Sequence, residues 1–301
     1  MVQYNQRQKY ETQNLWERKM KYYIASDIHG FYTAFRQALF AAGYFEDAEP
    51  HKLILLGDLF DRGEEALELQ DFILELMERD EVILIRGNHE DLYRDLVEFD
   101  NGVPLRHHRS NGTYSTALQL TDYDMVMATI CRDDFTEEAM QTPYYQRIMP
   151  AMRNYFETDR YVFVHGWIPC VREPNGYSYC SDWRNASEEE WERARWYNGI
   201  DAARTCMEEK TIVCGHWHVS YGHSKYNGKG SEFGEDACFE PYCDRGIIAV
   251  DACTSHSGKV NVLVLEDERD VMIDMTDDEK IDLVAARILE KYKGAFLELA
   301  K

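Results

Sequence analysis

Five short apolar runs in this chain are each followed by an aspartate, asparagine or histidine, and this regularity constrains the fold more than any other feature. The runs occupy residues 22–25, 53–56, 82–85, 161–164 and 211–214, and the polar residues after them are Asp27, Asp58, Asn88, His165 and His216. Runs this short, rich in β-branched residues and bounded by glycine, are typical of buried strands. Because ligands gather at the carboxyl ends of strands in open α/β sheets, we expect these five side chains to converge.

Helical patterns separate these runs. Apolar residues recur at helical spacing over 35–42, where Gly43 is the expected C-cap, and again over 69–77. Strand and helix therefore alternate, which predicts an α/β layered architecture. Two further strands are expected at 246–250 and 260–265, as a hairpin or a neighbouring pair.

The other segments complete a predicted single domain over residues 1–301. Residues 1–20 form a polar N-terminal arm, 91–160 is a mainly helical insertion able to cap a site, and apolar spacing predicts a closing helix at about 277–300. The stretch 222–245 favours a loop. It includes Cys238, Cys243 and His223, but their spacing matches no zinc pattern.

The charge of the chain restricts its partners. A formal net charge of -22 argues against long nucleic acids, because their binding depends on clustered lysine and arginine. The same acidity would repel a phosphate substrate at long range unless bound cations inverted the local field. A function directed at phosphate would therefore involve metal ions.

The cysteine pattern indicates the compartment. The eight cysteines show neither the paired spacing of a zinc knuckle nor the density of a disulfide scaffold. The first residues lack the apolar core of a signal peptide, and no apolar run reaches membrane-spanning length. We expect free thiols, a reducing cytoplasm and no membrane partner; nothing indicates the oligomeric state.

The first two polar motifs contain groups that bind metal and phosphate. Asp27 and His29 lie two apart, on the same side of an extended segment, so a carboxylate and an imidazole can bind one cation. Within 57–63, Asp58 can bridge two cations and Asp61 is a second acid. The guanidinium of Arg62 is suited to bidentate phosphate binding.

The later motifs extend this pattern. Asn88 and His89 supply an amide oxygen and an imidazole, and His216 and His218 place two imidazoles on one face. Taken singly, each residue has an ordinary alternative, since Asp and Asn at a strand end commonly cap a helix or form a turn, and His165 alone would be a core or surface histidine. The whole set, in order and at strand ends, indicates a metal site.

These motifs resemble those of the calcineurin-like metallophosphoesterase family. The similar segments are Asp-x-His at 27–29, Gly-Asp-x-x-Asp-Arg-Gly at 57–63, Gly-Asn-His-Glu at 87–90, His-Gly at 165–166 and Gly-His-x-His at 215–218. Segments 57–63 and 85–90 are similar to its serine/threonine protein phosphatase branch, particularly small bacterial and phage members. The resemblance covers about residues 22–265. It implies a two-sheet β-sandwich flanked by helices and a dinuclear metal-dependent phosphoesterase.

The resemblance also implies the metal ligands. One metal would be held by Asp27, His29 and His218, a second by Asn88, His165 and His216, with Asp58 bridging both. The family's metals are usually manganese, iron or zinc, and oxygen and imidazole ligands independently suit such metals better than calcium. A water shared by the two metals would lose its proton near neutral pH and attack phosphorus in line.

Further roles follow from the same resemblance. His89 would protonate the leaving alkoxide, Asp61 would orient His89, and Arg62 would bind phosphate. The family's protein phosphatases present a second phosphate-binding arginine between the fourth and fifth motifs. Three candidates lie in that part of this sequence: Arg184, Arg193 and Arg195.

The substrate class has alternatives. One is a phosphate monoester on a phosphorylated protein, peptide or small molecule; the other is a dinucleoside polyphosphate or another nucleotide. His218 gives the two-histidine motif of the wider superfamily, whereas many eukaryotic protein phosphatases keep only its first histidine. The aromatic residues Trp183, Trp191, Trp196 and Tyr197 would either stack a base or pack a helix onto the sheet. A metal-binding scaffold without activity is a third hypothesis, which the intact motifs disfavour.

Overall fold

The five predicted apolar runs are all strands in the structure, a computed structural model that describes residues 19–98, 104–174 and 176–268. They form β1 Lys19–Ala25, β2 His51–Leu55, β3 Val82–Leu84, β5 Tyr161–Phe163 and β8 Thr211–Cys214. The other strands are β4 Phe156–Glu157, β6 Val171–Glu173, β7 Gly176–Ser178, β9 Tyr242–Asp244, β10 Ile247–Ala249 and β11 Leu263–Glu268. The prediction that strands stop just before the polar motifs is confirmed.

Parallel pairing aligns the ends of these strands. One sheet has the order β11-β1-β2-β3, the second has the order β4-β5-β8-β10-β9, and β6 and β7 form a separate ribbon. In the first sheet, the parallel register places Leu55 of β2 beside Ala25 of β1 and Leu84 of β3. In the second, Cys214 of β8 lies beside Ala249 of β10. The polar residues that follow parallel strands therefore leave each sheet at one edge.

Alternate residues of each strand belong to different layers of the core. Tyr23 and Leu55 pack with the helices beside the first sheet. Ile24 faces the other way and packs with Phe163 and Val213 of the second sheet. Because successive strand residues point to opposite faces, this segregation means that the two sheets lie face to face. The predicted two-sheet sandwich flanked by helices is confirmed.

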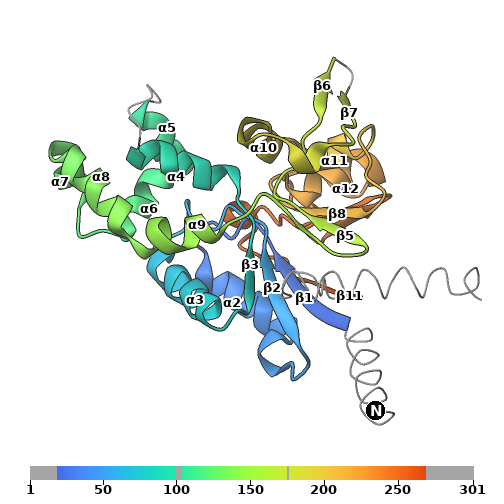
Figure 1. The fold of residues 1–301 in the computed structure, drawn as a ribbon, viewed down its shortest axis with the longest axis horizontal. Coiled ribbons are helices and arrows are strands. Elements are labelled where there is room, and N and C mark those ends of the chain that lie inside the picture. Colours follow the sequence, from blue (N-terminus) through green and yellow to red (C-terminus); the bar gives the residue numbers. More distant parts are fainter. Residues whose placement is uncertain (1–18, 99–103, 175, 269–301) are drawn as a thin grey trace, which may run out of the picture. The chain divides into compact units, whose positions relative to one another are not determined.

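Helices cover the outer faces of both sheets within residues 19–267 (Figure 1). Beside the first sheet lie α2 Tyr32–Ala41 and α3 Ala66–Glu78. Beside the second lie α10 Glu188–Arg195, α11 Gly199–Ala202 and α12 Val219–Asn227. Both predicted early helices are present, and Gly43, just past α2, has the left-handed φ of 80° expected at a C-cap. Short helical turns occur at η1 Tyr44–Glu46, η3 Trp183–Asn185 and α13 Thr254–Ser257.

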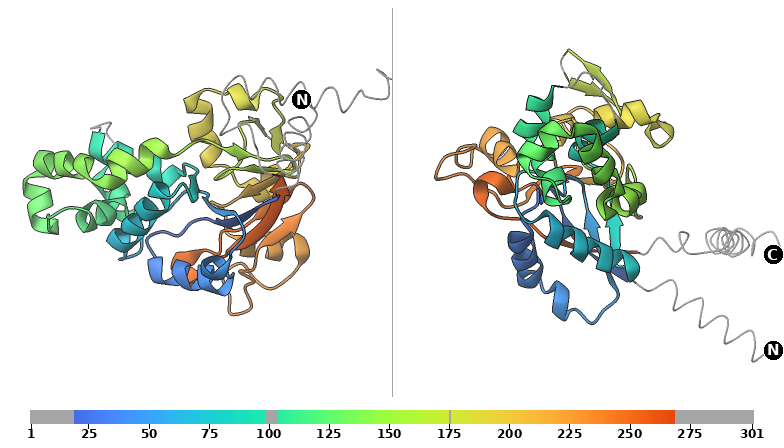
Figure 2. Two further views of the ribbon diagram at one scale, coloured as in Figure 1. Left: turned by 60° about the horizontal axis from the view of Figure 1, so that its bottom comes forward. Right: turned by 90° about the vertical axis from the view of Figure 1, so that its left-hand side faces the viewer.

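The predicted insertion at 91–160 contains a group of helices, drawn in green in Figure 2. They are α4 Asn88–Glu98, α5 Leu105–Asn111, α6 Thr113–Gln119, α7 Met125–Ile130, α8 Arg132–Gln141, the π-helix η2 Tyr144–Ile148 and α9 Met149–Ala151. Their apolar residues, such as Phe135 and Ile148, join the core beside the first sheet. In the described residues, no helix is both long and apolar enough to cross a bilayer.

The predicted pairing of the last two strands is wrong. β10 pairs with β8 and β9, whereas β11 lies at the edge of the first sheet beside β1. The connection over 250–262 includes α13 and two residues with positive φ, Cys253 and Gly258, so it can turn the chain from one sheet to the other. Of the predicted N-terminal arm, Lys19 and Met20 belong to β1. The rest of the arm and the predicted closing helix lie outside the described residues.

Candidate metal centre

The polar residues after the strands surround one cavity of about 210 Å³, hereafter the metal cavity. Its lining comprises Asp27, His29, Asp58, Arg62, Asn88, His89, Asn111, Trp196, His216, Trp217, His218, Asp251 and Cys253. Of the residues predicted for the site, only His165 and Asp61 are not in this lining. Both are buried directly behind it, in contact with Asp58 and His89 respectively. Segments separated by almost 200 positions thus meet at one place.

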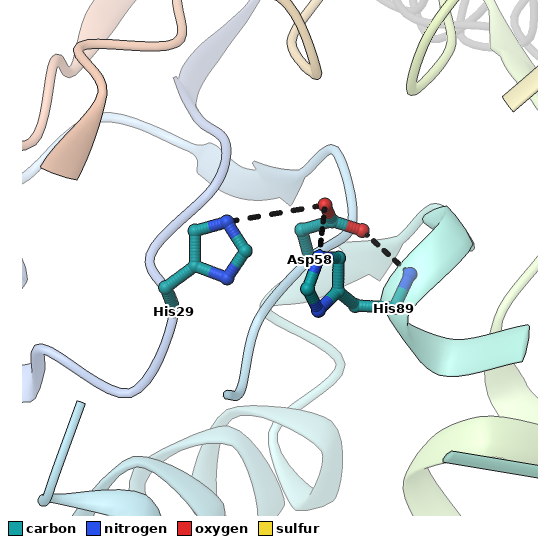
Figure 3. A group of neighbouring side chains, drawn as sticks. All are labelled: His29, Asp58 and His89. Carbon is teal, nitrogen blue, oxygen red and sulfur yellow. Dashed lines mark hydrogen bonds and ion pairs between the residues drawn. The ribbon is translucent and has the colours of Figure 1, made fainter. Parts of the chain in front are cut away.

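Asp58 is shared by two groups of side chains, each with ligand atoms within 4.8 Å of one another. The first group is His29, Asp58 and His89, drawn in Figure 3, and the second is Asp58, His165 and His216. Asp58 Oδ2 lies 3.9 Å from Nε2 of both His29 and His89, and Asp58 Oδ1 lies 3.3 Å from His165 Nε2. A carboxylate whose two oxygens face different histidine groups has the arrangement of a bridging ligand.

Two histidines are held with one ring nitrogen directed at the site. His29 Nδ1 lies 3.0 Å from the carbonyl oxygen of Phe60, and His165 Nδ1 lies 2.7 Å from that of Leu56. A carbonyl oxygen only accepts, so Nδ1 carries the proton in each ring. Nε2 then faces the acidic residues with its lone pair when the ring is neutral, which is the orientation that backbone carbonyls give to metal-binding histidines.

The other predicted ligands lie around these two groups. Asp27 Oδ1 is 4.0 Å from His29 Nε2, and Asn88 Oδ1 is 2.9 Å from His165 Nε2. Burial lowers the pKa of His216 to about 3, so its ring is a neutral donor. His218 lines the same cavity, but its Nε2 lies 2.7 Å from Glu232 Oε1.

Buried negative charge makes the cavity suited to cations. Burial raises the pKa of Asp27, and the nearby Asp58 charge raises it further. Asp251 behaves in the same way, with burial and then Asp27 raising its pKa. Burial alone would also raise the pKa of Asp58, but the adjacent histidines, His165 first, hold it well below its usual range. Carboxylate and amide oxygens with imidazole nitrogens form a donor set that fits manganese, iron or zinc.

The backbone is held in an uncommon conformation at this site. Of the eight described non-glycine residues with positive φ, six belong to the motifs: Asp27, His29, Asp58, Asp61, Arg62 and His216. Such conformations cost roughly 1 kcal/mol or more each and persist only where surrounding structure enforces them. The strand ends therefore turn sharply and direct these side chains into the cavity.

Motif glycines allow the loops to approach Asp27 and Asp58 closely. A Cβ atom on Gly87 would lie 2.2 Å from Asp58 Oδ1, and one on Gly215 would lie 2.3 Å from Asp27 Oδ2. The Glu90 carboxylate joins the loops after β2 and β3, since it accepts hydrogen bonds from the backbone N–H groups of Gly87, Asp58 and Leu59 at 2.7, 3.0 and 3.1 Å. Burial, with the Asp58 charge, raises the pKa of Glu90 to about 7.

His89 is the middle member of a chain of hydrogen bonds. Its Nδ1 lies 2.6 Å from Asp61 Oδ2, and its Nε2 lies 3.3 Å from Arg62 Nη2. The Asp61 carboxylate accepts hydrogen bonds from the hydroxyls of Thr113 and Thr116, at 3.0 and 2.6 Å. The insertion therefore positions Asp61, which in turn fixes the His89 ring. Sequence reasoning identified neither threonine.

The three candidates for a second phosphate-binding arginine do not line the metal cavity. Arg184 forms a bidentate pair with Glu157. Arg195 is buried, and its Nε lies 2.6 Å from Asp91 Oδ2. Arg193 lines a neighbouring cavity instead. In the lining of the metal cavity, Arg62 is the one arginine.

We expect Arg195→Met to lower the free energy of unfolding by about 3 kcal/mol, because the buried Asp91 carboxylate loses both nitrogen contacts with Arg195 and keeps the more distant Arg94, at 3.6 Å. Urea denaturation measures the change. Arg184→Met is the matched control, because the Arg184 side chain is 34% exposed against 3% for Arg195, and its loss should cost about 1 kcal/mol or less. Equal losses in the two variants would contradict a structural role specific to Arg195.

The aromatic residues predicted either to stack a base or to pack a helix differ in burial. Trp183 and Trp191 are buried in the core beside the second sheet. Trp196 is 49% exposed and lines the metal cavity, with its ring centroid 5.8 Å from that of His216. In the described residues, Cys238, Cys243 and His223 do not form a group able to hold a metal ion.

Comparison with known proteins identifies the family. The family model of calcineurin-like phosphoesterases matches residues 20–250. A bis(5'-nucleosyl)-tetraphosphatase of Anoxybacillus flavithermus is 30% identical over 133 residues, or 42% of this chain and 52% of that protein. One from a Geobacillus species is 37% identical over 82 residues, or 25% of this chain and 34% of that protein. The chain thus spans about half, or less, of the length of these relatives.

Solved structures match the chain at low sequence identity. A cold-active protein-tyrosine phosphatase of a psychrophilic Shewanella species has 19% sequence identity and a TM-score of 0.47, over 83% of this chain and 76% of that one. The family assignment rests instead on the match over residues 20–250, which is most of the chain and includes all five motifs. It confirms the resemblance carried by those motifs: the chain belongs to the calcineurin-like phosphoesterase family.

Proposed function

We propose that this protein hydrolyses phosphate monoesters with two bound divalent metal ions, in the manner of serine/threonine phosphatases. The observation that carries the proposal is the position of Asp58, whose two oxygens face separate groups of histidines. The residues assigned to hold the metals are Asp27, His29, Asp58, Asn88, His165, His216 and His218. Manganese is the first choice of metal, with iron or zinc as alternatives.

The bound ions would supply positive charge that activates water and stabilises the phosphoryl oxygens. The protein's own groups do the rest. Arg62, which lines the cavity, would bind two phosphate oxygens. His89 would donate a proton from Nε2 to the leaving oxygen, while Asp61 holds Nδ1. For this role Nε2 must carry a proton, so the contact in which it accepts from Arg62 would have to be released. For His218 to act as a ligand, its Nε2 would have to leave Glu232.

Two substrate classes fit this site. The first comprises phosphorylated proteins, peptides and small phosphate monoesters, favoured by Arg62 and by Glu90 in the 87–90 motif. The second is a dinucleoside polyphosphate or another nucleotide, favoured by relatives named bis(5'-nucleosyl)-tetraphosphatase. Rates on phosphoserine peptides and on diadenosine tetraphosphate, compared side by side, would distinguish them.

All eight cysteines are free thiols, which supports a location in the reducing cytoplasm.

Removal of metal tests the proposal directly. The purified protein should release phosphate from p-nitrophenyl phosphate in the presence of manganese, and excess chelator should abolish the activity. Readdition of manganese should restore it, because the ligand set persists in the folded protein. Magnesium at the same concentration is a control for ionic strength. Activity unchanged by chelation, or no metal-dependent activity on any phosphate ester, would contradict the proposal.

A further inference from the structure

A second, larger cavity opens beside the metal cavity. It has a volume of about 870 Å³, within the range of roughly 300–1,000 Å³ that small-molecule sites occupy. Its walls come from β6, β7, α10, α11 and α12. Trp196 and Trp217 line both cavities, so the two cavities adjoin. One molecule can therefore occupy both at once. The proposed hydrolysis does not use this space.

Aromatic side chains are unusually frequent in the lining. Tyr177 and Tyr197 lie with ring centroids 4.9 Å apart, and Trp217 and Tyr221 with centroids 5.9 Å apart. Trp196 is 49% exposed at the boundary with the metal cavity. Ring faces of this kind stack on nucleobases with little dependence on the base.

Among the described residues, the carboxylates of this cavity have hydrogen-bond partners within the protein, whereas its arginines do not. Its three carboxylates accept hydrogen bonds: Asp182 from Asn185, Glu190 from Ser187, and Asp201 from Tyr221, Tyr226 and Lys225. Its two arginines, Arg172 and Arg193, are exposed. Within the part of the chain that the structure describes, neither guanidinium makes a hydrogen bond or an ion pair. Both remain able to bind an anionic ligand, with two parallel hydrogen bonds to a phosphate.

We propose that this cavity binds the nucleoside part of a substrate, with the base against the aromatic faces and Arg172 and Arg193 on the adjoining phosphates. The inference rests on the proposed phosphoesterase function and defines its substrate as a nucleotide, with the scissile phosphate in the metal cavity. A peptide is recognised by addition to a sheet edge or in an apolar or aromatic-lined groove, with arginine clusters for its phosphates, and none of these modes stacks a planar base on ring faces. Stacking faces combined with unpaired guanidinium groups match a base and its phosphates more closely.

The test uses the double variant Arg172→Ala/Arg193→Ala on three substrates: diadenosine tetraphosphate, p-nitrophenyl phosphate and a phosphoserine peptide. We expect kcat/KM for diadenosine tetraphosphate to fall by at least about 10-fold, because charge-assisted hydrogen bonds to phosphate are lost. Hydrolysis of p-nitrophenyl phosphate, which occupies only the metal cavity, should stay within about 2-fold. Arg132→Ala is the matched control, since Arg132 is exposed and lines neither cavity, and it should change neither rate.

Calorimetric titration of the chelator-treated protein with adenosine monophosphate gives a readout independent of activity. Wild-type protein should bind it, and the double variant should bind about 10-fold more weakly. Nucleotide binding without any metal-dependent hydrolysis would reject the proposed function but retain this site. Metal-dependent hydrolysis of p-nitrophenyl phosphate would instead retain the function. In that case, two results would overturn the nucleoside site. One is that the wild-type protein does not bind adenosine monophosphate. The other is that the double variant loses activity only on the phosphoserine peptide.

Discussion

Replacing Asp58 with asparagine is expected to lower kcat on phosphate esters by about 10³-fold or more and to release bound metal, because metal charge contributes several kcal/mol to the transition state. Asp58 is the residue common to both histidine groups. Asparagine keeps one oxygen but removes the negative charge, and its amide nitrogen cannot bind a cation. Both metal positions should therefore weaken together. Metal stoichiometry after dialysis and steady-state kinetics with added manganese measure the two effects.

Asp80→Asn provides a control matched in chemistry and backbone. Asp80 also has positive φ, 53° against 51° for Asp58, but its side chain is 79% exposed and pairs with Lys52. Asparagine tolerates this left-handed conformation, so neither substitution should distort the backbone. Asp80→Asn should retain full activity and metal content. If Asp58→Asn did the same while folding normally by circular dichroism, the two metals would not be bound around Asp58.

Local sequence was sufficient to predict where each side chain of the site leaves its strand. A short apolar run that ends at a polar residue specifies a strand, a sharp turn and the direction of one side chain. Gly87 and Gly215 show why the turn needs glycine, since a side chain at either position would collide with a ligand carboxylate. The same signal follows the run at 246–250, where Asp251 enters the metal cavity. The expected pairing of this run, as a hairpin or a neighbouring pair with 260–265, gave no reason to place its end at the cavity.

Contacts between distant segments leave no comparable local signal. Thr116 donates to Asp61 across 55 positions, and Arg195 donates to Asp91 across 104. Neither pair follows from apolar periodicity, because the partner depends on how the helical insertion packs against the loop after β2. For the same reason, Arg195 resembled a phosphate-binding arginine in sequence but is a buried structural residue. The positions of motif residues were thus predictable, whereas the residues that support them were not.

His89→Ala is expected to lower kcat by about 10²–10⁴-fold on esters with poor leaving groups, such as phosphoserine, because general acid catalysis contributes this much. The ring is buried, with Asp61 on Nδ1 and Nε2 at the cavity. Burial would lower the pKa of His89, but the charges of Asp58 and Asp61 outweigh it and raise the pKa, which favours the protonated form. An ester of 2,4-dinitrophenol needs no proton on its leaving group, so its hydrolysis should change far less.

The comparison of leaving groups distinguishes proton donation from metal binding. His89 Nε2 lies 3.9 Å from Asp58 Oδ2, the same separation as for His29, so the geometry alone would also permit His89 to be a ligand. A ligand's loss would slow both esters equally and reduce the metal content. An acid's loss would slow the poor leaving group selectively and leave the metal in place. His107→Ala, an exposed histidine on α5 outside the cavity lining, should affect neither ester.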